Sequence, residues 1–295
     1  MKDMWTLKME KLERKFKYTV GIILYNPTKD EINSLTSYCE VFDKIYVYDN
    51  SRKNNEKDIQ LVLRSKNYEY LYNGENEGIS IPFNKMLSKA SEENYKYFLM
   101  MDQDSIFTKE NIEIAINQIE KNHTDDVAIY CPNILFNEAK SEEIKKDSYV
   151  DFCITSGSFV DIYKYLNLGG YDEKLFIDGI DRDYCIRVIE KGYKIIKMSD
   201  SVMKQNLGSK GKNLFGVFEH SAIRNYYIYR NRLYVINKYP DKYKYFNKFK
   251  YLYLSQLKQI ASIILFEKCK KSKFMYIRRA KKDYESNKFG KYREE

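Results

Sequence analysis

The sequence predicts an α/β fold with a mainly parallel, doubly wound sheet, and three features support this prediction. Apolar runs rich in β-branched and aromatic residues alternate with segments of helical apolar spacing, from about residue 17 to residue 195. Several of these runs stop at polar or acidic residues, as in FLMMDQDS at 98–105. The length of 295 residues permits one large domain with an appendage. Ligands of such a sheet bind at the carboxyl ends of its strands.

The first part of the chain divides into short apolar runs and helical patterns. Residues 1–16 are expected to be an N-terminal extension, either a short amphipathic helix or a segment without a structural role. Strands are expected at 17–27, 44–51, 68–73 and 97–102, because these runs end in turn residues or carboxylates. Helices are expected at 31–42, 58–64 and 79–91. Asp49 and Asp102 therefore fall at strand ends.

The second part continues the alternation and then becomes helical. A strand is expected at 126–132, and residues 151–170 suggest a strand, a Ser/Gly turn and a short helix. Residues 171–195 begin acidic, continue as a helix that closes at Gly192, and lead into a final strand. We expect a catalytic domain over 17–215 and a C-terminal helical extension over 216–295.

Composition excludes several classes of protein. The five cysteines contain no C-x-x-C pair and only two histidines are present, so neither a disulfide framework nor a Cys/His zinc site is expected. The longest apolar stretches, such as IASIILF at 260–266, are too short to span a bilayer. These features favour a cytoplasmic protein.

The net charge of +9 belongs to the C-terminal extension. Residues 241–295 carry 16 Lys and Arg against 6 Asp and Glu, whereas residues 1–240 carry 35 against 36. Such a basic tail is typical of binding to nucleic acid or to a membrane surface, or of a merely solubilising segment.

Asp102 and Asp104 form a D-x-D pair directly after an apolar strand. Two carboxylates at this spacing can chelate a hard divalent cation that also binds substrate phosphates. Such a cation neutralises a diphosphate group as it leaves a sugar. An isolated D-x-D in a loop can equally be a solvated turn.

Seven segments occur in the order found in family 2 glycosyltransferases with the GT-A fold, which the chain resembles from about residue 18 to residue 232. The segments are ILYNP, VYDNS, NGENEGISIPFNKML, FLMMDQDS, ITSGSFV, GGYDEKLFIDGIDRDYCIR and HSAIRNYYIYRN. The D-Q-D-S and L-F-I-D-x-x-D elements are similar to those of the rhamnosyltransferase branch. The resemblance implies a Rossmann-like mixed, mainly parallel sheet flanked by helices.

The resemblance also implies a binding site for a nucleotide-sugar donor. The residues implied are Tyr25, Asn26, Asp49, Asn76, Gly78, Asn84 and Asp102. The first three match positions that hold the nucleobase and ribose, and the next three match an N-x-G-x-x-x-x-x-N pattern that lines the donor pocket. The types of residue in that pattern also suit turns and helix caps. Asp102 would contact the ribose side, and Asp104 would ligate a metal ion on the diphosphate.

The segment IDRDYCIR aligns with the family element E-D-x-D-x-x-x-R, which implies that Asp181 is the catalytic base. This carboxylate would take the proton of the acceptor hydroxyl in a single displacement with inversion. Ile180 stands in place of the usual acidic neighbour, as in the rhamnosyl branch. The residues implied to support the site or contact the acceptor are Thr155, Ser156, Gly157, Asp178, Asp183, Arg187 and Arg224. The acidic residues among them also suit the start of a helix.

The implied cofactor is a divalent cation, Mg²⁺ or Mn²⁺. Relatives often have a histidine before the L-G of KQNLG, where this chain has Gln205, so one possible metal ligand is missing. His220 is the other candidate nearby, although its position suits the start of a helix.

The C-terminal extension interleaves aromatic residues with lysines between 242 and 253. Rings at headgroup depth with lysines on anionic lipid would hold the enzyme on a membrane surface. The same residues could form a helical cap packed on the catalytic domain. No nucleic-acid-binding motif accompanies the charge, so nucleic acid is not an expected partner.

The sequence therefore predicts an inverting glycosyltransferase on the inner face of the cell membrane. Its expected donor is dTDP-L-rhamnose, and its expected acceptor is a hydroxyl of a polysaccharide or of a lipid-linked oligosaccharide. A UDP-hexose transferase is the alternative within the same class. The alternative from another class is a non-catalytic protein that binds a membrane surface or nucleic acid. A D-x-D phosphatase is disfavoured because its aspartates would follow the first strand, which here ends in Tyr25-Asn26-Pro27.

Overall fold

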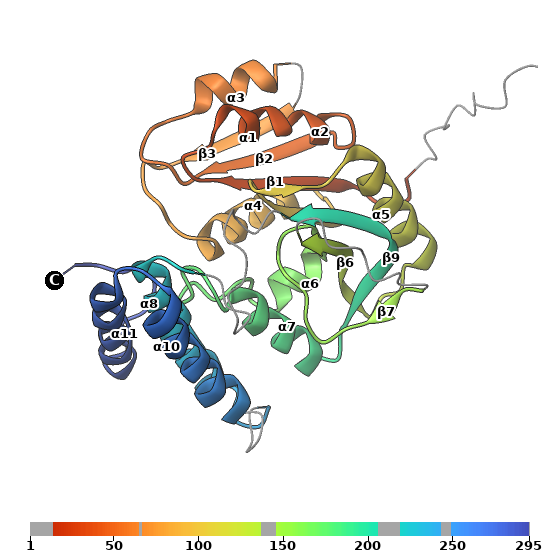
Figure 1. The fold of residues 1–295 in the computed structure, drawn as a ribbon. Helices are drawn as coiled ribbons and strands as arrows, with labels where there is room; N and C mark the ends of the chain where they lie inside the picture. Colours follow the sequence, from red (N-terminus) through yellow and green to blue (C-terminus); the bar gives the residue numbers. More distant parts are fainter. Residues whose placement is uncertain (1–13, 65–66, 137–145, 206–218, 243–248, 295) are drawn as a thin grey trace, which may run out of the picture.

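The computed structural model describes residues 14–64, 67–136, 146–205, 219–242 and 249–294. A nine-stranded mixed sheet has the order β3-β2-β1-β4-β8-β6-β9-β5, with β7 paired to β9 (Figure 1). The strands are β1 (Tyr18–Leu24), β2 (Lys44–Asp49), β3 (Asn67–Tyr72), β4 (Tyr97–Asp102), β5 (Ser105–Ile106), β6 (Val127–Phe136), β7 (Ser148–Tyr149), β8 (Ser158–Asp161) and β9 (Lys194–Gln205).

Helices cover both faces of the sheet, and a further group of helices lies at one end of the molecule (Figure 1). Those of the catalytic domain are α1 (Lys29–Ser34), α2 (Thr36–Cys39), α3 (Glu56–Val62), α4 (Ser80–Glu92), α5 (Lys109–Asn122), α6 (Ile162–Asn167) and α7 (Ile180–Glu190). Those of the C-terminal part are α8 (Ala222–Lys238), the π-helix η1 (Phe249–Leu254), α10 (Ser255–Phe266) and α11 (Lys270–Glu285).

The apolar run before Asp102 is explained by burial on both faces of β4. Phe98 and Met100 face the core that α4 covers, whereas Leu99 and Met101 face the core on the other side. All four side chains are at most 1% exposed. A strand that is buried on both faces reads as a continuous apolar run rather than an alternating one. Removing a ring such as that of Phe98 would cost roughly 3–5 kcal/mol.

The sheet is mixed and mainly parallel, as expected, and the structure shows which strands pair in each direction. Strands β1, β2, β3 and β4 pair in parallel, as do β6 and β9. Strand β8 runs antiparallel between β4 and β6. It can do so because residues 151–157 form a loop and turn before it. The strand expected from residue 151 therefore begins only at Ser158.

Two helical expectations also differ from the structure. The helix expected over 31–42 is two short helices, α1 and α2, which meet at Leu35. Helix α5 is missing from the expected elements, although Thr108 caps it and its Ile112, Ile116 and Ile119 have helical spacing. These residues are fully buried against the sheet.

The C-terminal helices pack on one another and on the catalytic domain. Tyr227 of α8 stacks on Phe176 with ring centroids 5.1 Å apart, and Tyr226 donates a hydrogen bond to Asp283 of α11 at 2.8 Å. Lys291 forms an ion pair with Glu75 at 3.1 Å. For these described residues the structure favours a helical cap on the catalytic domain. Half of the aromatic and basic residues singled out between 242 and 253 lie outside the described residues.

Candidate active site

Strand pairing brings two of the predicted acidic residues to one edge of the sheet. Leu24 of β1 pairs with Asp49 of β2, and Ile23 of β1 pairs with Asp102 of β4. The two residues therefore lie within one residue of the same level on either side of β1, and their side chains point to opposite faces of the sheet, since Ile23 and Leu24 belong to opposite cores. This edge is the carboxyl end of the parallel strands, where ligands of such sheets bind.

Asp102 lies in a concentration of negative charge. The pKa of Asp102 is raised to about 7, mainly by burial and then by the negative charges of Asp104 and Asp181. The pKa of Asp104 is also raised, mainly by burial. The positive charge of Arg224 opposes both shifts and lowers the pKa of each carboxyl. Side chains from β4, the loop after it, α7 and α8 thus share one electrostatic environment.

Asp181 lies in the first turn of α7, and the turn after Ile154 holds it in place. The backbone N–H of Thr155 donates to Oδ1 of Asp181 at 3.0 Å, and the Thr155 hydroxyl donates to the same oxygen. Among the described residues, no hydrogen bond reaches Oδ2 of this carboxylate. Burial raises the pKa of Asp181, although the bonds from Thr155 oppose the shift. A fixed carboxylate with one available oxygen and a raised pKa suits a general base.

The turn formed by residues 155–157 also contacts the D-x-D segment. The backbone N–H of Asp102 donates to Oγ of Ser156 at 3.1 Å, and the Ser156 hydroxyl bonds that of Ser105 at 2.9 Å. Gly157 has a φ of +81°, and its N–H donates to the Met100 carbonyl at 2.8 Å. This turn therefore joins Asp181 to the end of β4.

Asp178 and Arg224 form a weak ion pair beside these carboxylates. The guanidinium of Arg224 is 3.3 Å from Oδ1 of Asp178, and the Arg224 side chain is half exposed. Asp178 has a φ of +64°, and its carbonyl accepts a hydrogen bond from Asn231 at 2.9 Å. Oδ2 of Asp178 is buried without a hydrogen-bond partner among the described residues. The pair therefore contains one unsatisfied carboxylate oxygen and one accessible cation.

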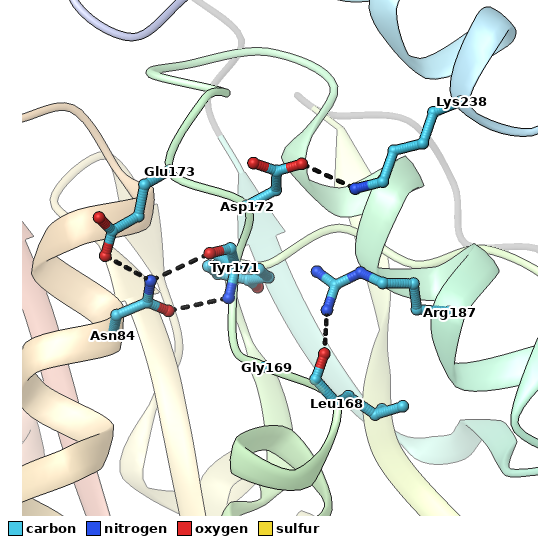
Figure 2. A pocket seen from close by; sticks show the side chains of 8 residues that line it. All are labelled: Asn84, Leu168, Gly169, Tyr171, Asp172, Glu173, Arg187 and Lys238. Atoms are coloured by element: carbon cyan, nitrogen blue, oxygen red, sulfur yellow. Dashed lines mark hydrogen bonds and ion pairs between the residues drawn. The ribbon is translucent and has the colours of Figure 1, made fainter.

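Asp183 and Arg187, both predicted as site residues, hold helices of the fold together through buried hydrogen bonds and ion pairs. Asp183 is fully buried and accepts hydrogen bonds from Arg187 at 3.0 Å, Lys238 at 2.7 Å and Tyr239 at 2.8 Å. Arg187 also donates to the carbonyl of Leu168 at 2.5 Å (Figure 2). These bonds tie α7 to the end of α8 and to the loop after α6.

Asp49 is directed into the protein rather than toward a cleft. Its carboxylate accepts hydrogen bonds from the Ser51 N–H at 2.9 Å, the Asn55 amide at 2.9 Å and the Tyr70 hydroxyl at 2.7 Å. The residue is fully buried. In this structure Asp49 therefore shapes the loop after β2, and a contact with a nucleobase would need a further acceptor position on the same carboxylate.

Tyr25 and Asn26 project from the end of β1. The Tyr25 side chain is 50% exposed, and the Gln103 amide bonds both its N–H and its carbonyl. Asn26 has a φ of +47°, and its N–H donates to Oγ of Ser51. The exposed Tyr25 ring is therefore available for stacking, and the middle residue of D-Q-D positions it.

Asn76 and Gly78 form a tight turn after β3. The N–H of Gly78 donates to Oδ1 of Asn76 at 2.8 Å. Gly78 has a φ of +79°, and a Cβ at this position would lie 2.2 Å from the carbonyl oxygen of Phe176. Only glycine fits this close approach without strain.

Asn84 lines a cavity of about 440 Å³ together with Leu168, Gly169, Tyr171, Asp172, Glu173, Arg187 and Lys238 (Figure 2). Its side-chain nitrogen donates to the Tyr171 carbonyl and to Glu173, and its side-chain oxygen accepts from the Tyr165 hydroxyl and the Tyr171 N–H. All four hydrogen-bonding positions of the amide are thus used inside the protein. Asn84 thus links α4 by hydrogen bonds to the loop before α7.

A larger cavity of about 860 Å³ lies between the turn after β3 and the end of the chain. Its lining includes Asn76, Glu77, Phe176, Arg230 and the segment 287–294. The residues that line these two cavities do not include Asp102, Asp104 or Asp181. Of the predicted donor residues, Asn76 and Asn84 line these cavities, whereas Tyr25, Asn26, Asp49 and Asp102 lie at the ends of β1, β2 and β4.

Within the ranges that the structure describes, Asp102 and Asp104 are the pair expected to hold a metal ion. Among the described residues, no group of three or more His, Cys, Asp and Glu side chains is placed to hold a metal ion. Burial raises the pKa of both carboxyls, and the charge of Asp104 raises that of Asp102 further. Such a pair fits a hard cation that takes its remaining ligands from water and phosphate oxygens. Gln205 pairs in register with Ser105 and so lies beside this segment, although its amide is a weaker ligand than an imidazole.

Sequence reasoning missed several residues that organise the site. Gln103 positions Tyr25, Ser105 bonds Ser156, and Lys238 neutralises Asp183. Gln103 and Ser105 belong to the D-Q-D-S motif, so the motif itself was the available signal. Lys238 carries no comparable signal because it reaches Asp183 across 55 residues of sequence.

Comparison with known proteins identifies the family. The model of glycosyl transferase family 2 matches residues 19–177, which is more than half of the chain. The dTDP-rhamnosyl transferase RfbF of Shigella flexneri is 26% identical over 235 residues, covering 74% of this chain and 79% of the relative.

Solved structures of glycosyltransferases share the fold. GalNAc-T7 with UDP, GalNAc and Mn²⁺ matches with a TM-score of 0.60 and 14% identity over 93% of this chain, which spans 58% of that protein. S. aureus TarS 1–349 in complex with UDP-GlcNAc matches with a TM-score of 0.55 and 15% identity, covering 94% of this chain and 93% of that one.

These findings confirm the expected GT-A fold and set aside the non-catalytic alternative. No helix in the described ranges is long and apolar enough to cross a bilayer. The match with the family model and the shared fold lead to one identity: the chain belongs to glycosyltransferase family 2 and has the GT-A fold.

Proposed function

We propose that the enzyme transfers L-rhamnose from dTDP-L-rhamnose, with inversion, to a hydroxyl of a polysaccharide or of a lipid-linked oligosaccharide. The observation that carries this proposal is the position of Asp181. Thr155 holds one oxygen of this carboxylate in the same electrostatic environment as the D-x-D pair and Arg224. The sequence similarity to a dTDP-rhamnosyl transferase supports the donor.

In the proposed reaction Asp181 takes the proton of the acceptor hydroxyl. The acceptor oxygen forms a bond to the anomeric carbon as the bond from that carbon to the diphosphate breaks, and dTDP leaves with the bonding electrons. Because the attack comes from the face opposite the diphosphate, the configuration inverts. The raised pKa of Asp181 makes this carboxylate a stronger base than an exposed aspartate.

The proposed leaving-group side consists of Asp102, Asp104 and Arg224. Asp104 and Asp102 would hold a divalent cation, which supplies positive charge to the diphosphate oxygens when bound. Arg224 is half exposed and bound to Asp178 through one long contact, so it can turn toward the diphosphate. A guanidinium there would compensate in part for Gln205 in place of a histidine ligand.

Tyr25, Asn26, Asn76 and Gly78 belong to the proposed donor site. The exposed Tyr25 ring would stack on the base, while the Asn76-Gly78 turn forms the wall after β3. Asp49 and Asn84 would act through the loops that they hold. The proposed acceptor lies on the side of Thr155 and Ser156, and the proposed location is the inner face of the cell membrane.

Release of nucleoside diphosphate from a panel of donors tests the proposal. The panel contains dTDP-L-rhamnose, UDP-glucose, UDP-galactose and UDP-N-acetylglucosamine, each with Mg²⁺ or Mn²⁺. We expect dTDP release from dTDP-L-rhamnose to exceed UDP release from every UDP-sugar. If a UDP-sugar is turned over and dTDP-L-rhamnose is not, the enzyme belongs to the UDP-hexose alternative. That alternative is considered because TarS, which shares the fold, binds UDP-GlcNAc.

A further inference from the structure

The connection between α10 and α11 exposes large apolar side chains. Leu265 is 61% exposed, Met275 63%, Ile264 49% and Phe274 37%. We call residues 264–275 the α10–α11 tip. Apolar side chains that gather in one short segment mark an interaction surface, whereas single exposed ones do not.

The exposed charged side chains of the α10–α11 tip are positive. Lys268, Lys270 and Lys271 are all exposed. Glu267 is the only acidic residue of the segment, and it is 5% exposed. Its carboxylate faces inward, because Lys273 donates to Oε2 at 2.7 Å. The outer side of this segment therefore presents mainly lysines and apolar groups, and the neighbouring Glu219 carboxylate is bound to the Lys268 N–H and to Lys273.

The surface at the start of α11 is hollowed. Cys269 has a φ of +54°, which turns the chain sharply between the two helices. A cavity of about 480 Å³ lies beside this turn, lined by Cys269, Lys270, Lys271, Ser272 and Met275. Cationic groups thus border an apolar hollow at the start of α11.

Charge complementarity identifies the partner. Two copies of the α10–α11 tip would bring lysines of like charge together, which opposes self-association through this surface. An anionic bilayer offers the opposite charge for the lysines and an apolar interior for the neighbouring side chains. This combination of exposed apolar groups and lysines fits a lipid surface.

We propose that the α10–α11 tip docks the enzyme on an anionic membrane, with Leu265 and Met275 entering the headgroup region. This surface is distinct from the aromatic and basic residues between 242 and 253. The proposal deepens the membrane location in the proposed function and rests on that part of it. It brings the catalytic domain to an acceptor carried by a lipid.

Vesicle co-sedimentation of the full chain tests the proposal, with phosphatidylcholine vesicles that contain or lack phosphatidylglycerol. We expect binding only to the anionic vesicles and weaker binding at high salt. The variant K268Q/K270Q/K271Q should bind about 100-fold more weakly, since each lysine near the surface contributes about five-fold. The variant L265Q/M275Q should also bind more weakly. The matched control K29Q/K57Q/K121Q removes three exposed lysines of the catalytic domain and should bind like the unmodified enzyme.

Three results would overturn the proposal: equal binding of the tip and control variants, no binding to anionic vesicles, or self-association that the tip variants abolish in sedimentation velocity. Release of dTDP from dTDP-L-rhamnose in solution is measured on the same samples and should be equal for all variants. Loss of that activity in every sample, with vesicle binding intact, would refute the proposed donor and leave the docking surface standing.

Discussion

Replacement of Asp181 by asparagine separates its chemical role from its structural one. Both hydrogen bonds from Thr155 end on Oδ1, and an amide oxygen at that position can still accept them. The carboxylate that would receive the proton is lost, however. Loss of a positioned general base lowers turnover by roughly 10²–10⁴-fold, which corresponds to about 3–5 kcal/mol of the activation barrier.

The same variant should also raise the free energy of unfolding at neutral and alkaline pH. Burial raises the pKa of Asp181 in the folded protein above its unfolded value, so the ionised form destabilises the fold. This penalty is absent below the unfolded pKa and complete above the raised folded pKa. Asp181→Asn should therefore be more stable than the unmodified enzyme at pH 8, and the difference should disappear on acidification.

Donor turnover, dTDP binding and thermal unfolding of Asp181→Asn are measured together. We expect turnover to fall by at least 10²-fold, dTDP affinity to change little, and the unfolding temperature at pH 8 to rise. Thr155→Val is the matched variant, because it removes one hydrogen bond to Asp181 and keeps the base. It should lower turnover less. A fully active Asp181→Asn enzyme would refute the assignment of the base.

Three further predictions concern the surrounding residues. Arg224→Gln should lower turnover by roughly 10²-fold and weaken dTDP binding, with partial recovery in Arg224→Lys; unchanged kinetics would remove Arg224 from the leaving-group side. Asp183→Asn should lower the free energy of unfolding, measured in urea, by roughly 3–5 kcal/mol, because it removes a fully buried carboxylate that pairs with Arg187 and Lys238; a change below 1 kcal/mol would contradict its role in holding α7 to the end of α8. Gly78→Ala should destabilise the protein by at least about 1–3 kcal/mol, owing to its positive φ and the close Phe176 carbonyl; an unaffected urea midpoint would refute that strain.

Much of the fold could be predicted because burial leaves a direct trace in the sequence. The run before Asp102 is apolar at every position because β4 has a core on each face. The same logic located β1 and β2 and the acidic residue Asp49 at the end of β2. The antiparallel direction of β8 left no such trace, since a buried strand reads alike in both directions and the turn at Gly157 decides its course.

The site could be predicted only in part, since residue type does not report the direction of a side chain. Asp181 and Asp183 lie two positions apart in one helix, yet Asp181 joins the acidic group and Asp183 is buried among cations. Asp49 and Asn84 likewise match donor positions, but their polar atoms bond within the protein. Such partners come from distant segments, which spacing along the chain does not reveal.

The most direct test of the account is thermal unfolding with dTDP, UDP or GDP, each with and without Mn²⁺. A nucleotide at about 100 times its dissociation constant should stabilise the fold by roughly 2.7 kcal/mol. We predict that dTDP raises the unfolding temperature more than UDP or GDP does, that Mn²⁺ increases this shift, and that Asp104→Ala abolishes the contribution of the metal. If no nucleotide shifts the transition, or if Asp104→Ala behaves like the unmodified enzyme, the end of β4 is not the donor site.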